Sequence, residues 1–83
     1  MNWSYITFRS VTFAQRGESV LRQRYIETAL QRTPKWMEEQ GCGYCLRLPS
    51  GKAMDAVQIL KSKQIPFRKV YTQAGDDFME MHL

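Results

Sequence analysis

The fold is decided by residues 44–60, which read YCLRLPSGKAMDAVQIL. Over residues 44–48 the side chains alternate, and Tyr44, Leu46 and Leu48 fall on one face, as they do in a strand. The pattern then changes, because apolar residues recur at helical spacing at positions 53, 56, 57 and 60. This stretch therefore predicts a strand over 44–48, followed by a helix from about 50 to 63.

The same two patterns continue outward along the chain. Alternation and β-forming residues predict strands over 3–9, 25–31 and 65–71, with a helix from about 11 to 24 between the first two. The order strand, helix, strand, strand, helix, strand favours an α+β fold, the ferredoxin-like sandwich. In that fold a four-stranded antiparallel sheet carries both helices on one face, and the third strand runs antiparallel beside the first.

The last part of the chain differs in charge from the rest. Asp76, Asp77 and Glu80 follow a body that carries every lysine and arginine, and the whole chain has a net charge of +4. We therefore expect a domain over residues 1–71, followed by an acidic C-terminal tail over 72–83 that is solvated or loosely docked.

Composition limits the class of protein. The chain of 83 residues, 43% of them hydrophobic, is enough for one domain with a small core. No apolar run is long enough to span a membrane, and the first residues lack the basic start and apolar core of a signal peptide. We therefore expect a cytoplasmic protein whose cysteines are kept reduced.

The only two cysteines, Cys42 and Cys45, form a C-x-x-C motif. In the expected fold Cys42 lies near the end of the first strand at Arg9 and near the start of the first helix at 10–12. An arginine and a helix N-terminus both lower the pKa of a cysteine, because they stabilise the thiolate. Cys42 is therefore either a reactive thiol or a small, half-buried loop residue.

Three motifs resemble a known family in their order and spacing. They are Thr-Phe-Arg-Ser-Val-Thr at 7–12, Thr-Pro at 33–34 and Cys-Gly-Tyr-Cys-Leu-Arg-Leu at 42–48. This pattern resembles the small bacterial and archaeal domains described as putative selenium/sulfur carrier-like proteins. The resemblance implies a ferredoxin-like domain that holds sulfur or selenium as a persulfide or perselenide. For such a carrier we expect donor and acceptor proteins as partners, no cofactor and no enzymatic turnover.

Under that resemblance Cys42 is the carrier thiol. The residues expected to stabilise its anion are Arg9, Ser10, Thr12 and Gly43. Ser10 and Thr12 stand at the helix start, where backbone N–H groups favour a negative charge. Gly43 would let the backbone approach closely and adopt a positive φ.

Cys45 is a candidate second thiol, a disulfide partner of Cys42 or a packed sheet residue. An extended chain of three residues spans about 10 Å, whereas a disulfide needs Cα atoms about 4.4–6.8 Å apart, so a bridge requires a tight turn at 43–44. The packed sheet residue is favoured. Zinc could use both cysteines and His82, but zinc needs about four ligands, so no metal is expected.

The sheet face turned away from the helices offers a different class of function. Trp3, Tyr5 and Arg47 are expected on that face. Aromatic rings and arginines can stack on nucleic-acid bases. The same face could instead bind a protein partner, form a homodimer or be covered by the tail, and nucleic acid is the less favoured of these.

Overall fold

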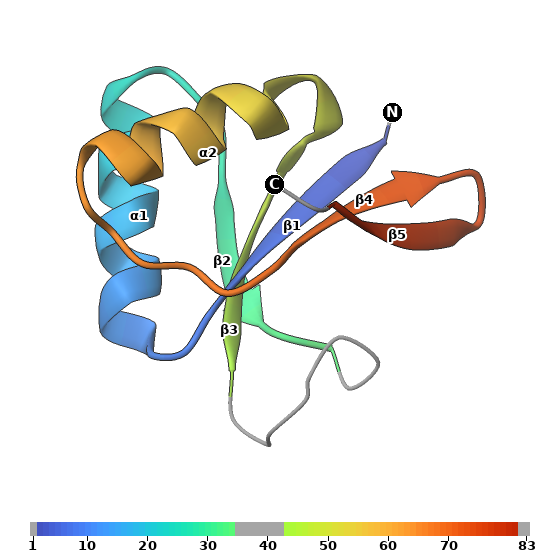
Figure 1. Cartoon of the computed structure of the whole chain (residues 1–83), viewed down its shortest axis with the longest axis horizontal. Coiled ribbons are helices and arrows are strands. Elements are labelled where there is room, and N and C mark those ends of the chain that lie inside the picture. Colours follow the sequence, from blue (N-terminus) through green and yellow to red (C-terminus); the bar gives the residue numbers. More distant parts are fainter. Residues whose placement is uncertain (1, 35–42, 82–83) are drawn as a thin grey trace.

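The computed structural model of the chain describes residues 2–34 and 43–81. Within these residues lie two α-helices and one five-stranded sheet (Figure 1). In chain order the elements are β1 (Trp3–Phe8), α1 (Val11–Gln23), β2 (Ala29–Arg32), β3 (Tyr44–Pro49), the 3₁₀ helix η2 (Ser50–Lys52), α2 (Ala53–Ser62), β4 (Val70–Ala74) and β5 (Asp77–Met81). Neither α-helix in the described part of the chain is long and apolar enough to cross a membrane.

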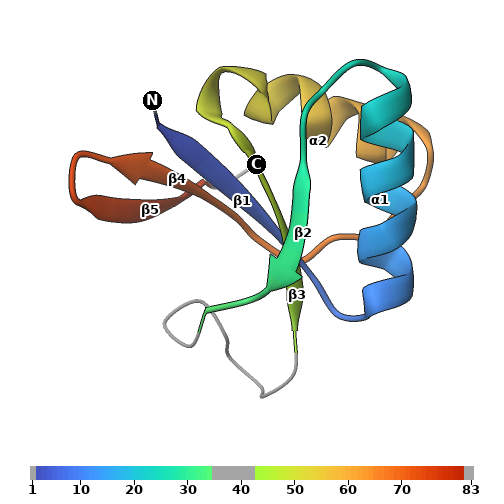
Figure 2. The same ribbon diagram turned by 180° about the vertical axis from the view of Figure 1, so that it is seen from behind.

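The sheet is open and antiparallel, with the strand order β2-β3-β1-β4-β5. The predicted pairing of the first and third strands is confirmed, since Ile6 lies opposite Leu46 and Phe8 opposite Tyr44. Figure 2 shows β2 on one side of the sheet and the β4–β5 hairpin on the other. This register brings the end of β1 and the start of β3 to the same end of the sheet.

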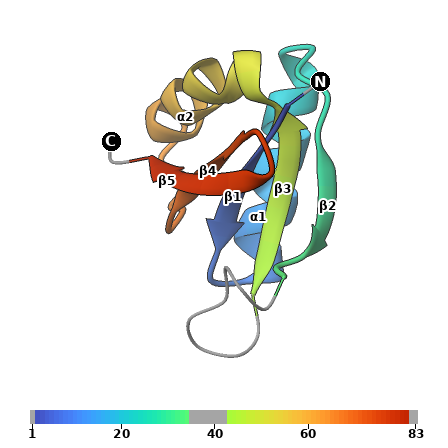
Figure 3. The ribbon, with the colours of Figure 1, turned by 90° about the vertical axis from the view of Figure 1, so that its right-hand side faces the viewer.

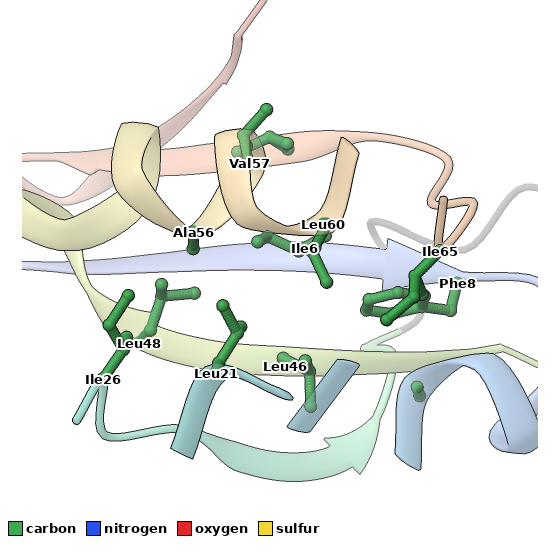
Figure 4. Close-up of a cluster of buried hydrophobic side chains, with 12 residues drawn as sticks. Ile6, Phe8, Leu21, Ile26, Leu46, Leu48, Ala56, Val57, Leu60 and Ile65 are labelled. Carbon is green, nitrogen blue, oxygen red and sulfur yellow. The ribbon is translucent and has the colours of Figure 1, made fainter. Parts of the chain in front are cut away.

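Both helices pack on one face of the sheet, as predicted (Figure 3). The apolar side chains of β1 and β3 point into the space between sheet and helices, where they meet the buried stripes of α1 and α2 (Figure 4). Burial of such side chains is the main favourable contribution to folding. The fully buried members include Ile6, Phe8, Ala14, Leu21, Leu46, Leu48, Ala56, Val57 and Leu60.

The expected sheet of four strands was wrong in its count, because residues 77–81 form a fifth strand. Residues 72–83 were expected as an acidic tail, yet 72–74 complete β4 and 77–81 pair with it as β5. Gly75, with a φ of +64°, opens the two-residue loop between Ala74 and Asp77, and glycine takes this conformation without strain. Phe78 then contacts Tyr5 on the sheet, and Met81 packs against the core. The segment is therefore part of the fold despite its acidic charges.

The second strand starts later than predicted, at Ala29 instead of residue 25. Tyr25 has a φ of +62°, and Ile26 donates its backbone N–H to the carbonyl oxygen of Leu21 at 3.0 Å. This is the Schellman closure of a helix, in which the apolar residue after the turn packs on the last helical turn. Ile26 is buried for that reason, and not as a strand residue.

The fourth strand also starts later than predicted, and the cause is the same. Gln64 has a φ of +57°, and Ile65 donates its backbone N–H to the carbonyl oxygen of Leu60 at 3.0 Å. Ile65 therefore closes α2, and β4 begins at Val70.

Candidate functional site

One end of the sheet brings together the segments that carry the predicted site. Here β1 ends at Phe8 and β2 ends at Arg32, and both residues lie opposite Tyr44, the first residue of β3. The carbonyl oxygen of Gly43 accepts a hydrogen bond from the backbone N–H of Thr33 at 3.0 Å. The chain therefore enters β3 between the last residues of β1 and β2.

Gly43 is closely surrounded at this position. A Cβ atom placed on Gly43 would lie 3.2 Å from Thr33 Oγ1 and 3.7 Å from the carbonyl oxygen of Phe8. The Gly43 backbone therefore packs closely against Thr33 and Phe8, and its predicted role in binding an anion stays a prediction. The predicted positive φ is not found at Gly43, so it is the lack of a side chain that matters here.

The first helix begins beside this point. Ser10 is its N-cap, and the Ser10 Oγ accepts a hydrogen bond from the backbone N–H of Phe13 at 3.3 Å. The backbone N–H groups of Val11 and Thr12 belong to the first turn, where no intrahelical carbonyl can accept them. The positive end of the helix macrodipole therefore lies at this end of the sheet. Arg9, which is exposed, adds a full positive charge.

Cys42, predicted as the carrier thiol, lies outside the described residues, as does His82. The described chain resumes at Gly43, the residue bonded to Cys42. Gly43 itself lies beside the end of β1, and β1 leads directly into α1.

Cys45 has the surroundings of a packed sheet residue. Its thiol is free and fully buried, and its strand neighbours are Thr7 on β1 and Gln31 on β2. Burial raises the pKa of the Cys45 thiol to about 11, although the Thr33 and Gln31 side chains and the charge of Arg47 act in the opposite direction. Thr33 Oγ1 makes no hydrogen bond of ordinary geometry within the described structure, so its contribution is weak. Cys45 is therefore protonated at neutral pH and a poor nucleophile.

The helix-free face of the sheet carries the residues predicted for the alternative function. The guanidinium of Arg47 lies over the ring of Trp3, 4.5 Å from its centroid. Tyr5 meets Phe78 edge to face, with ring centroids 5.5 Å apart. These contacts join β3 and β5 to the central strand β1 and leave the four side chains half-buried. Binding at this face stays a prediction. A protein partner or a second copy of the chain is favoured there over nucleic acid.

Comparison with known families assigns the chain. The family model described as "Putative Se/S carrier protein-like" matches residues 4–72, which include both helices, β2, β3 and all of β1 except Trp3. The chain belongs to this family. No curated protein and no solved structure matches it. The match ends within β4, so β5 is outside the part of this Se/S carrier-like protein that the family model covers.

The sequence analysis of this Se/S carrier-like protein did not identify two neighbours of Cys45. Gln31 and Thr33 lie beside Cys45. The signal for Gln31 was present, since it follows the apolar Leu30 in the strand and therefore lies on the opposite face. No sequence pattern indicated Thr33 as a neighbour. Among the residues that the structure describes, no three His, Cys, Asp or Glu side chains gather as metal ligands would.

Proposed function

We propose that this protein carries sulfur or selenium on the thiol of Cys42, as a persulfide or perselenide. The Cys42 thiolate attacks the outer sulfur of a donor persulfide, R–S–SH, and the donor thiolate R–S⁻ leaves. The product is Cys42–S–SH, and no oxidant or reductant is consumed. An acceptor thiolate then takes the outer sulfur by the same reaction, which restores the Cys42 thiolate. The protein itself turns over no substrate.

Membership in the Se/S carrier-like family supports this proposal, and one observation about the fold carries it. Gly43 enters the sheet beside the Phe8 carbonyl, next to the start of α1. We propose that a thiolate or persulfide anion on Cys42, the residue before Gly43 in the chain, is stabilised by the positive helix end, the N–H groups of Val11 and Thr12 and the charge of Arg9. These groups stabilise the charged forms on which sulfur transfer depends.

The properties of Cys45 support the choice of Cys42 as the carrier thiol. Its burial and its raised pKa keep it protonated, so it does not compete with Cys42 for the incoming sulfur. A protonated Cys45 also does not attack a persulfide on Cys42, which would release sulfide and leave a disulfide. The proposal includes a reducing, cytoplasmic setting, in which both thiols stay reduced between transfers.

Sulfur loading tests the proposal directly. The full chain is incubated with a cysteine desulfurase and free cysteine, and persulfide formation is read by intact mass spectrometry and by peptide mapping. We expect the wild-type chain and the Cys45→Ala variant to gain one sulfur atom on Cys42, and the Cys42→Ser variant to gain none. Alkylation against pH is the supporting measurement, and Cys42 should titrate below about pH 7.5. Equal loading of Cys42→Ser and wild type would contradict the proposal.

A further inference from the structure

Three hollows meet at Phe67, on the segment that connects α2 to β4. One of about 60 Å³ lies against the start of α1 and is lined by Arg9 and Phe13 as well as Phe67. A second of about 250 Å³ lies towards β5, and a third of about 460 Å³ lies towards the end of α2. Phe67 lines all three, and we call them together the Phe67 groove.

Positive charge dominates the lining of the Phe67 groove. Four cationic side chains, Arg9, Lys61, Arg68 and Lys69, line it against one carboxylate, Glu80. Lys69 Nζ lies 3.5 Å from Glu80 Oε1, so the carboxylate of the lining has a partner within it. Four cations and one carboxylate give the lining side chains a net charge of +3, which favours an acidic ligand over a basic one.

The floor of the groove is apolar. Phe13, Phe67 and Met81 pack against the hydrophobic core and remain partly exposed, and Pro66 lines two of the three hollows. An apolar floor with charges at its rim is the arrangement of a protein-binding surface, where apolar side chains are buried at the centre and charges at the rim set specificity.

The groove reaches the candidate site at Arg9. Arg9 is bonded to Ser10, the N-cap of α1, and follows Phe8, whose carbonyl oxygen is close to Gly43. A segment bound in the groove would therefore hold its own protein beside the end of the sheet where β3 starts.

We propose that the Phe67 groove docks an acidic segment of a partner protein, with an apolar side chain at the centre of that segment. The charge of the rim selects the acidic residues, and the floor around Phe67 accepts the apolar side chain. Naming this partner as the sulfur or selenium donor or acceptor rests on the proposed function, but the preference for acidic segments does not.

The test measures peptide binding to the full chain without any sulfur or selenium cargo. An eight-residue peptide of Glu and Asp with one central Leu is titrated into ¹⁵N-labelled protein, and backbone amide shifts are followed. We expect the largest shifts at Phe13, Phe67 and Lys69, with a Kd of about a millimolar or tighter. The same peptide with Ala at its centre should bind more weakly, and a Lys-rich peptide should not bind.

Variants at the two ends of α2 supply the matched control. Lys61→Glu, in the groove, should weaken binding about five- to tenfold at low salt, whereas Lys52→Glu makes the same charge change at the other end of the helix and should not. Glu80→Gln removes the single acid and should tighten binding. This gain cannot be produced by unfolding.

Three results would overturn the proposal. They are no localised shifts with the Leu peptide, equal weakening by Lys61→Glu and Lys52→Glu, or tighter binding of a single-stranded oligonucleotide at the same residues. Sulfur loading is measured in a separate assay on the same chain. A protein that loads sulfur but fails to bind the peptide therefore loses the docking proposal only, and one that binds but fails to load loses the carrier role only.

Discussion

Burial controls the chemistry of the thiol at Cys45. The side chain is fully buried between β1 and β2, and burial raises its pKa to about 11. A buried thiolate would lose its hydration, and the neighbouring Gln31 and Arg47 only partly replace it. In a C-x-x-C motif that runs into a strand, the second cysteine thus takes the role of a packed residue, because the sheet covers it.

The raised pKa of Cys45 predicts a pH dependence of stability. In the unfolded chain the thiol ionises above about pH 8.5, whereas in the folded protein it stays protonated up to about pH 11. Above pH 8.5 the unfolded state therefore binds fewer protons, and the free energy of unfolding falls as pH rises. Over this range the loss due to Cys45 should reach about 2–3 kcal/mol.

Urea unfolding between pH 7 and 10.5 measures this loss. Tyrosine and lysine also titrate in the alkaline range, so the Cys45→Ala variant is the reference. Its stability should fall less steeply with pH than that of the wild-type protein. Parallel curves for the two proteins would show that Cys45 is not buried as a neutral thiol.

Residue-level expectations succeeded where they depended on local chemistry. Ser10 was expected at the start of the first helix, and its hydroxyl caps α1. Gly43 was expected to allow a close approach and a positive φ, but its φ is not positive, although its backbone is closely surrounded. The side chain nearest to it belongs to Thr33, which no sequence pattern indicated as its neighbour.

At the scale of elements, the helix ends explain the errors in the strand boundaries. Ile26 and Ile65 are β-branched residues after a helix, and such residues are typical of strands. Each instead donates a hydrogen bond back into the helix that it follows, and each is buried against the core. Local β-propensity was overridden because helix closure satisfies a carbonyl group and buries an apolar side chain in one step.

The end of α1 provides a stability test. Tyr25 is 95% exposed and has a φ of +62°, a conformation that costs a non-glycine residue free energy. Tyr25→Gly should therefore raise the free energy of unfolding by about 0.5–1 kcal/mol. Gln15→Gly, at an exposed position inside the same helix, should lower it by about 1 kcal/mol.

Chemical denaturation of the two variants and the wild-type protein gives both differences. Opposite signs are expected because glycine relieves strain only where φ is positive. A loss of stability at both positions would mean that the helix does not end at Tyr25.

At the scale of the whole molecule, the acidic C-terminal stretch is part of the sheet. β5 adds to the edge of β4, Phe78 contacts Tyr5 across the helix-free face and Met81 packs against the core. The turn of this hairpin lies on the side of the molecule away from α1 (Figures 1 and 2). The strand thus covers the open edge of β4, which would otherwise present unpaired backbone groups.

Neighbouring residues of β5 test whether this stretch is folded. Phe78 is half-buried against Tyr5, whereas Met79 is 62% exposed. Phe78→Ala should lower the free energy of unfolding by about 1–2 kcal/mol, and Met79→Ala should change it by less than about 0.5 kcal/mol. Thermal unfolding followed by circular dichroism distinguishes the two, and a solvated tail would leave both variants as stable as the wild-type protein.

Sequence patterns were enough to predict the α+β class, both helices, the pairing of β1 with β3 and the family. These features depend on the period of apolar residues and on short motifs, which act locally and are visible in a single chain. Other features depend on how the elements pack together. Ile26 and Ile65 close helices through hydrogen bonds to carbonyl groups five residues back, and burial against the core favours this arrangement over a strand. Three further features depend on contacts between residues far apart in the chain: the neutral state of the buried Cys45 thiol, the pairing of 77–81 with β4 and the charges from four segments that line the Phe67 groove. The free energies of these contacts outweigh local propensity and charge.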